Sequence, residues 1–281
     1  DALEEARFRR ALLFPVSVAE RARVEEGGFS AVHIGSEAFV DRDGFSLKGK
    51  RFADLRQMVN RARARHGVLT RELITGAHQL PLSDVYRSWL GARPVQRPMA
   101  LVISTPGFSA PFARRYFVAH VEDEPMAFVT LTPGWAGRGM GLDVMARNPK
   151  APAGTMELLL IATMEQVFDE GIEFVSLGAC PMAERHPLDG SDPRLLRWIF
   201  RTLYRSRIGN RLFNFRSLAH FKAKFSPRWE PLYIAGWPRL TVRSLYTGCR
   251  MWGLFGRPAL DRSARQSLDC VEAGRVSSER T

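Results

Sequence analysis

Hydrophobic positions repeat at helical spacing in two long segments of the chain. In residues 50–66, apolar side chains recur every three or four positions while arginines take most other positions, which predicts a helix with one packed stripe and a basic remainder. The stripe consists of Phe52, Leu55, Val59 and Ala62. The same spacing in residues 155–170 predicts a second helix, which Thr155 caps and Gly171 ends. Its buried face consists of Met156, Leu159, Leu160, Thr163 and Val167.

Alternation of apolar and polar residues predicts strands elsewhere. Residues 115–121 and 126–131 alternate around an acidic turn, which is typical of an antiparallel hairpin. Further strands are predicted at residues 141–145, 173–177 and 232–235. The order is then a β-meander, a helix, a strand, a helix and a final strand. This order predicts an α+β fold with a mixed central sheet flanked by helices.

The first part of the chain gives shorter patterns. Residues 3–13 are predicted to be helical, and β-like runs follow at residues 31–34 and 38–40. A helix is also predicted at residues 82–90, with Ser83 as its cap. The first 47 residues are too short to form a domain by themselves.

The charge of the chain is positive and unevenly distributed. The sequence has 41 Lys and Arg against 29 Asp and Glu, a net charge of +12, which favours a polyanionic partner such as RNA or an anionic bilayer. Residues 48–65 hold seven basic residues against the single acid Asp54, and residues 194–228 hold ten basic residues and no acid. Because a merely solvated surface more often mixes both signs, these runs predict phosphate binding. The alternative is that the charge only keeps the protein soluble.

The cysteines, the histidines and the lengths of apolar runs indicate whether to expect disulfides, a metal site or a membrane-spanning segment. The cysteines Cys180, Cys249 and Cys270 show neither a disulfide framework nor metal-ligand spacing, and the six histidines are scattered, so no metal is expected. Cys180 is expected to be a small packing residue. No run of about 20 apolar residues exists to span a bilayer. Because the chain begins with Asp1, we expect it to be an excised fragment. Whether a membrane segment lies upstream is left open by the sequence.

Four blocks of the sequence resemble one known enzyme family. The most informative is GNRLFNFRSLAHFKAKFSPRWEPLY, residues 209–233, which interleaves aromatic residues, Asn214 and paired lysines. The others are FSLKGKRFADLRQMVNRARARHG at 45–67, LDVMARNPKAPAGTMELLL at 142–160 and FVSLGACP at 174–181. In this order they resemble the C-terminal domain of the phosphatidylglycerol lysyl- and alanyltransferases, which are lipid aminoacyltransferases.

The resemblance implies a fold similar to the GCN5-type N-acetyltransferases and a division of the chain. Residues 1–47 would be part of a first acyltransferase-like lobe, 48–67 a basic linker helix, and 68–236 the main aminoacyltransferase domain. Residues 237–281 would be a basic and aromatic tail with a disordered end. Arginines mixed with aromatic residues in this tail suit either a membrane surface or packing over the core.

The resemblance also implies the substrates. An aminoacyl group would pass from an aminoacyl-tRNA to a polar lipid such as phosphatidylglycerol, at the cytoplasmic face of a bacterial membrane and without a bound cofactor. A coenzyme A-dependent N-acyltransferase is the enzymatic alternative. The GRGMG run at 137–141 favours it only weakly, because the run precedes a strand rather than a helix. A module that only binds RNA or anionic lipid is the other alternative, because Ala146 stands where the resemblance implies an arginine.

Four residues are candidates for chemistry at the site. Asp143 is the first candidate for a catalytic or amino-group-binding role, because a carboxylate is unusual within an apolar strand. Arg147 is a candidate substitute for the absent arginine, although on a strand it would point to the opposite face from position 146. Ser176 is a candidate donor to the substrate, without a His and Asp to make it a nucleophile. Glu157 is either an anchor for the substrate amine or an acid favoured by the helix dipole.

Basic and polar residues of the C-terminal block are candidates for donor binding. Lys222 and Lys224 lie between Phe221 and Phe225, whose burial is expected to aim both lysines away from the core. Lys224 is a candidate to contact the terminal phosphate or ester of the donor, Lys222 to bind substrate and Asn214 to position the loop. The arginines expected to bind phosphates of tRNA or lipid are Arg194, Arg197, Arg201, Arg205, Arg51 and Arg61.

Overall fold

Two compact units make up the protein. The structure, a computed structural model, describes residues 10–73, 79–93, 114–181, 183, 198, 202 and 215–252. The first unit combines residues 1–41 and 176–249, and the second combines residues 42–175 and 250–281. Within the described ranges, no helix has both the length and the apolar character needed to cross a membrane. The domain boundaries expected from the sequence stay predictions.

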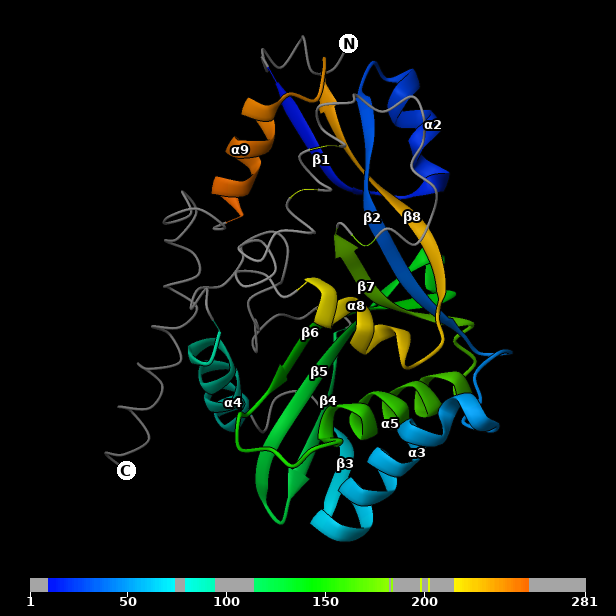
Figure 1. Ribbon diagram of the computed structural model, residues 1–281, viewed down its shortest axis with the longest axis vertical. Helices are drawn as coiled ribbons and strands as arrows, with labels where there is room; N and C mark the ends of the chain where they lie inside the picture. Colours follow the sequence, from blue (N-terminus) through cyan, green and yellow to red (C-terminus); the bar gives the residue numbers. More distant parts are fainter. Residues whose placement is uncertain are drawn as a thin grey trace. The chain divides into compact units, whose positions relative to one another are not determined.

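The first unit is built on strands that surround β8. Its strands are β1 (Ala11–Val16), β2 (Ser30–Asp41), β8 (Arg228–Trp237) and most of β7 (Phe174–Pro181). β8 pairs antiparallel with β1 on one side and with β2 on the other, and β7 follows β2 in the strand order (Figure 1). The helices are α2 (Val18–Glu26), α8 (Phe215–Ala223) and α9 (Val242–Met251).

The N-terminal elements differ from the sequence prediction in one respect. Residues 11–13 belong to β1, where the sequence predicts a helix, because pairing with β8 supplies hydrogen bonds that a local pattern does not reveal. The rest of that predicted helix lies outside the described residues. The β-like runs at 31–34 and 38–40 are confirmed and join into the single strand β2. Between these strands, α2 begins at a capping box in which Ser17 and Glu20 satisfy each other's backbone amides.

The second unit contains a four-stranded antiparallel meander. Its strands are β3 (Val68–Leu73), β4 (Arg115–Val121), β5 (Glu124–Gly134) and β6 (Gly139–Arg147), paired in that order. The helices are α3 (Ala53–Asn60), α4 (Gln79–Gly91) and α5 (Thr155–Asp169). Short helical segments are η1 (Lys50–Phe52), η2 (Arg61–Arg65) and η3 (Trp135–Gly137). The hairpin and the third strand predicted from alternation are therefore confirmed.

The helices of the second unit cover both faces of this meander. α5 packs on β3, β4 and β5, and α3 packs on α5, while α4 packs on β5 and β6 (Figure 1). Both predicted helical stripes are buried, so the 3.6-residue period identified the packed faces correctly. Burial of each such Leu or Phe side chain contributes about 1.5–3 kcal/mol to the stability of the folded state.

Two predicted helix caps are wrong. Ser83 lies inside α4 and is buried, because the helix begins four residues earlier at Gln79. Gly154, not Thr155, is the N-cap of α5, with φ 87° in the left-handed region that favours glycine. The Thr155 hydroxyl instead donates to the Pro152 carbonyl oxygen at 2.7 Å. Gly171, which follows the C-cap of α5, has φ 99° and ends the helix as predicted.

Candidate functional site

Ser176 and Lys222 are brought together around β7 in the first unit. The Ser176 hydroxyl donates to the Glu37 carboxylate at 2.5 Å and accepts from the Gly178 amide at 3.0 Å. The Lys222 ammonium donates to the carbonyl oxygens of Gly178 and Ala179 at 2.9 and 3.0 Å. The segment of β7 around Gly178, which has positive φ, is thus contacted by the side chains of both Ser176 and Lys222. The hydroxyl that we expect to serve a substrate has a protein partner here.

The two lysines of the C-terminal block do not behave alike. Lys222 is buried, with 4% of its surface exposed, which contradicts the prediction that both lysines point away from the core. Its long aliphatic stem lies within the packed interior, and its ammonium reaches two backbone carbonyl oxygens of β7. Lys224 is only partly buried, and its ammonium lies 5.4 Å from the centre of the Phe221 ring. Phe225 is buried as expected.

Burial lowers the pKa of Lys222 and raises the pKa of Glu37. The pKa of Lys222 lies below its ordinary value because burial disfavours the ammonium, with Cys180 and Glu37 opposing the shift. The pKa of Glu37 is raised because burial disfavours the carboxylate, although Ser176 and Lys222 oppose it. Glu37 was not identified from the sequence. A carboxylate between the apolar residues of β2 was the available signal, the same kind that identified Asp143.

Asp143 occupies a β-bulge in the second unit. Thr130 of β5 pairs with Val144, and the next residue, Leu131, pairs with Leu142, so Asp143 is the extra residue of β6. The Val144 amide donates to the Thr130 hydroxyl at 3.0 Å. A bulge interrupts the alternation of the strand and re-aims side chains, and bulges are frequent next to active sites. This local geometry places the Asp143 carboxylate beside α4.

Arg114 forms an ion pair with Asp143. A guanidinium nitrogen of Arg114 lies 2.8 Å from the Asp143 carboxylate, and the side chains are only 15% and 14% exposed. The phenol of Tyr86, on α4, is near enough for the Asp143 charge to act on it. The pKa of Tyr86 is raised to about 12, mainly by burial and in part by Asp143, while Arg93 opposes the shift. Arg114 and Tyr86 were not identified from the sequence, because neither lies near Asp143 along the chain.

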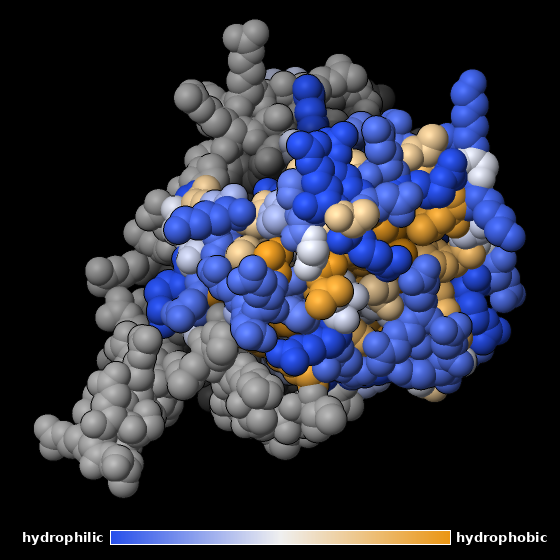
Figure 2. Space-filling model, turned by 90° about the horizontal axis from the view of Figure 1, so that it is seen from below, coloured by the Kyte–Doolittle hydropathy of each residue, from blue (hydrophilic) through white to orange (hydrophobic). Residues whose placement is uncertain are grey.

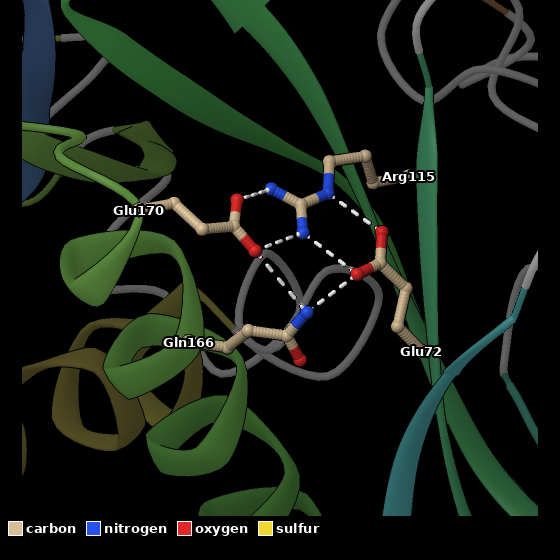
Figure 3. Close-up of polar contacts among 4 residues, drawn as sticks. All are labelled: Glu72, Arg115, Gln166 and Glu170. Carbon is tan, nitrogen blue, oxygen red and sulfur yellow. Dashed lines mark hydrogen bonds and ion pairs between the residues drawn. The ribbon is translucent and has the colours of Figure 1, made fainter.

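Arg115, the next residue, is anchored by a separate network. Its guanidinium binds the Glu72 carboxylate through two nitrogens at 2.6 and 2.7 Å and also binds Glu170 (Figure 3). The Gln166 amide donates to both carboxylates, at 2.5 Å to Glu72 and 3.3 Å to Glu170. Arg115 lowers the pKa of Glu170. The network ties the end of α5 to β3 and β4.

The remaining candidates of the second unit lie apart from Asp143 or are enclosed. Arg147 is exposed at the end of β6 and pairs in the ladder with Ala127, whereas Ala146 is fully buried in the cluster beneath α4. Glu157 is buried in the first turn of α5, with 5% of its surface exposed. Their roles stay predictions.

Basic residues of the predicted linker helix are exposed. Arg51 and Arg61 lie on the solvent side of the segment from η1 to η2, and Arg61 borders a shallow depression with Gln57, Met58 and Ala153. Hydrophilic residues cover most of the coloured surface in the view from the lower end of Figure 1 (Figure 2). The predicted residues outside the described ranges are Arg194, Arg197, Arg201, Arg205 and Asn214.

The start of α5 is closely covered by α3. A β-carbon built on Gly154 would lie 2.4 Å from the Met58 carbonyl oxygen and 3.3 Å from the Ala62 side chain. Only glycine therefore fits at the N-cap of α5, because any side chain there would collide with the backbone of α3. Among the described residues, no group of three His, Cys, Asp or Glu side chains is arranged to hold a metal ion.

Comparisons with known proteins give similar sequences and structures. The family model for the C-terminal part of phosphatidylglycerol lysyltransferase matches residues 3–236. The chain is 25% identical over 235 residues to the phosphatidylglycerol lysyltransferase of Bacillus subtilis, covering 80% of this chain and 26% of that protein. It is 28% identical over 228 residues to the lysylphosphatidylglycerol biosynthesis bifunctional protein LysX of Mycolicibacterium vanbaalenii, covering 77% of this chain and 20% of that protein. The chain thus spans a fifth to about a quarter of the length of these relatives.

Two solved structures confirm the expected α+β fold. The C-terminal domain of a putative lysylphosphatidylglycerol synthetase from Agrobacterium fabrum is 26% identical, with a TM-score of 0.64 over 83% of this chain and 70% of that one. The structure of L-PGS from Bacillus licheniformis is 21% identical, with a TM-score of 0.67 over 91% and 76%. Since the family model covers most of the sequence, the chain belongs to the phosphatidylglycerol lysyltransferase C-terminal family.

Proposed function

We propose that this chain transfers an aminoacyl group from an aminoacyl-tRNA to a polar membrane lipid such as phosphatidylglycerol, at the cytoplasmic face of a bacterial membrane. Family membership supports aminoacylation of a lipid in general. The observation that carries the proposal is the Asp143 carboxylate, which sits on a bulge of β6 and is held by Arg114. A largely buried acid at an irregular strand position is typical of a functional site rather than of a packed sheet.

The proposed reaction exchanges one ester for another. A hydroxyl oxygen of the lipid attacks the carbonyl carbon of the aminoacyl ester, and the bond from that carbon to the ribose oxygen of the tRNA breaks. The proton of the lipid hydroxyl ends on the ribose oxygen, so the exchange consumes neither water nor ATP. The protein has to place the two substrates together, accept and return this proton, and stabilise the oxyanion between the two steps.

Asp143 has two suitable roles in this exchange. Its carboxylate can accept the proton of the attacking hydroxyl, or it can bind the ammonium of the aminoacyl group. Both roles require a carboxylate that is fixed in direction, and the contact with Arg114 provides this condition. Lys224 is proposed to contact the donor, since its side chain is only partly buried, whereas the buried Lys222 serves the structure of β7.

The charge of the chain supports tRNA as the donor. The net charge is +12, and the exposed arginines of the segment from η1 to η2 include Arg51 and Arg61. Phosphate contacts of this kind are independent of base sequence and orient the nucleic acid. Coenzyme A remains the less favoured alternative, because the loop before α5 reads NPKAPAG and contains the single glycine Gly154, unlike a Gly-rich pyrophosphate-binding turn.

A transfer assay with labelled donor tests the proposal. The protein is incubated with radiolabelled aminoacyl-tRNA and phosphatidylglycerol vesicles, and label is counted in the organic phase. We expect label with these vesicles and none when the vesicles contain only phosphatidylcholine. With D143N, we expect the rate of labelling to fall about 100-fold. A circular dichroism spectrum of D143N confirms that the variant is folded.

Two other outcomes contradict the proposal in different ways. If no label moves while tRNA and vesicles still bind, the chain is a binding module without transferase activity. If an amine becomes acylated only when acetyl coenzyme A is supplied, the donor is a thioester and the tRNA assignment is wrong.

A further inference from the structure

We infer that Arg114 is the positioning residue for Asp143, and that it acts in the proposed transfer only through that carboxylate. The inference rests on the proposed function for the role of Asp143. It goes further by assigning a task to a residue that is distant along the chain and that lies directly before β4.

The bulge explains why Asp143 needs a partner. As the extra residue of β6, Asp143 lies between the pairs formed by Leu142 and Val144 and takes no place in the ladder with β5. The extra residue of a bulge does not follow the regular alternation of the strand, so the ladder does not set the direction of its side chain. The Asp143 side chain therefore depends on side-chain contacts for its direction, and Arg114 supplies one at 2.8 Å.

Burial makes this contact strong. Both side chains are about one-seventh exposed, so water screens the pair much less than it screens an ion pair on the surface. The described residues also include a solvent-exposed ion pair for comparison. Arg87 lies 2.6 Å from Asp84 on α4, but these two side chains are 54% and 59% exposed. Exposed pairs contribute little, so Arg87 is a matched control.

The contacts of Arg115 explain to which face of the sheet Arg114 points. Successive residues of an extended chain point to opposite faces, and Arg115 is held on the α5 side by Glu72, Glu170 and Gln166 (Figure 3). Tyr116, the residue after Arg115, packs in the cluster beneath α4. Arg114 is thereby directed to the α4 side, where the bulge also directs Asp143.

A double-mutant cycle on transfer activity tests the inference. D143N is expected to lower kcat about 100-fold, and R114M to lower it at least about tenfold. The double variant R114M/D143N is expected to match D143N, because Arg114 then has no carboxylate to position. R114K, which keeps the charge, is expected to recover most of the loss, and R87M to leave kcat unchanged. Multiplying losses in the double variant, or an R114M with the kcat of R87M, would overturn the inference.

A second measurement does not depend on activity. Hydrogen exchange of the Val144 amide, which donates to Thr130 at the bulge, is expected to accelerate about tenfold or more in R114M and not in R87M. Unchanged exchange in R114M would overturn the positioning role even if the chain transferred no aminoacyl group. Conversely, a wild-type protein without activity but with the expected exchange would contradict the proposed function alone. If D143N is fully active, the role of Asp143 in the transfer is wrong.

Discussion

The Lys222 ammonium donates a hydrogen bond to the carbonyl oxygen of Gly178 at 2.9 Å, and this contact joins α8 to β7 inside the first unit. Gly178 has φ 83°, and the Ser176 hydroxyl accepts a hydrogen bond from its amide. Side chains therefore satisfy backbone groups at a point where the strand departs from regular geometry. Of the two lysines at the end of α8, Lys222 thus stabilises the fold, and Lys224 is the one that we propose to contact the substrate.

K222M is expected to destabilise the protein more than K224M. Removing the Lys222 ammonium takes a buried donor away from the carbonyl oxygens of Gly178 and Ala179, which costs about 2 kcal/mol in the free energy of unfolding. The contact of Lys224 with the Phe221 ring is partly exposed and is worth less than about 1 kcal/mol. Urea unfolding of both variants measures the difference. Equal effects would show that the two lysines have equivalent structural roles.

E37Q is expected to change how stability depends on pH. Burial raises the pKa of Glu37 above its ordinary value of 4.5. Between 4.5 and the raised pKa, the folded protein binds more protons than the unfolded chain. The Glu37 contribution to the free energy of unfolding therefore decreases as pH rises through that window. E37Q lacks this decrease and becomes relatively more stable as the pH rises. Unfolding free energies of both proteins between about pH 4 and 7 test this.

The burial of Lys222 produces an opposite dependence at higher pH. Its lowered pKa means that the unfolded chain binds more protons between that value and 10.5, so stability rises with pH there. Because the Glu37 charge opposes this lowering, E37Q lowers the Lys222 pKa further, which also makes E37Q relatively more stable as the pH rises. A difference between E37Q and wild type that stays constant with pH would contradict the raised pKa of Glu37.

G154A is expected to destabilise the protein more than G171A. Both glycines flank α5 with φ of 87° and 99°, so alanine costs about 1–2 kcal/mol in backbone conformation at either position. A β-carbon at Gly171 meets nothing within 4 Å, whereas at Gly154 it lies 2.4 Å from the Met58 carbonyl oxygen. Because this atom belongs to the backbone of α3, the helices must separate, which costs about 1–3 kcal/mol more. Thermal unfolding of both variants is the measurement, and equal midpoints would contradict the close contact of α3 and α5.

R51Q/R61Q is expected to weaken tRNA binding and its dependence on salt. If each arginine neutralises one phosphate, the slope of log K against log salt concentration becomes less negative by about 0.9 for each phosphate that is no longer neutralised. R23Q is the control, since Arg23 is also exposed but lies on α2 among Glu20, Glu25 and Glu26. Binding is measured by filter retention at several salt concentrations. An unchanged slope in R51Q/R61Q would show that this helix does not contact the nucleic acid.

Local periodicity accounts for what the sequence predicted correctly about the fold. The stripes from Phe52 to Ala62 and from Met156 to Val167 are buried, because helical spacing forces residues three and four apart onto one face. The hairpin of β4 and β5 was equally predictable, since alternation and an acidic turn are both local. Where pairing with a distant strand decides the structure, as at residues 11–13, the local pattern is misleading.

The candidate site was predictable only in part. Asp143 attracts notice as a carboxylate in an apolar strand, Glu157 as an acid on the first turn of a helix and Ser176 as a polar residue of a strand before Gly178. Each is at least largely enclosed in the structure. Their partners Arg114 and Glu37 were missed, because the residues that they contact are far away in sequence, although the carboxylate of Glu37 within β2 gave a signal like that of Asp143. The expected exposure of Lys222 was wrong, since the burial of a side chain depends on what packs over the helix and not on its neighbours alone.

By itself, the sequence determined the family, the order of most helices and strands, and the identity of the acid in β6, because motifs and periodicity are properties of adjacent residues. Only the tertiary structure decided that Asp143 lies on a bulge, that Arg114 pairs with it and that Lys222 turns inward. These features follow from strand register and from contacts between segments that are distant in the chain. Such contacts exist only once the backbone has folded, because the energy of a buried charge depends on every group that surrounds it.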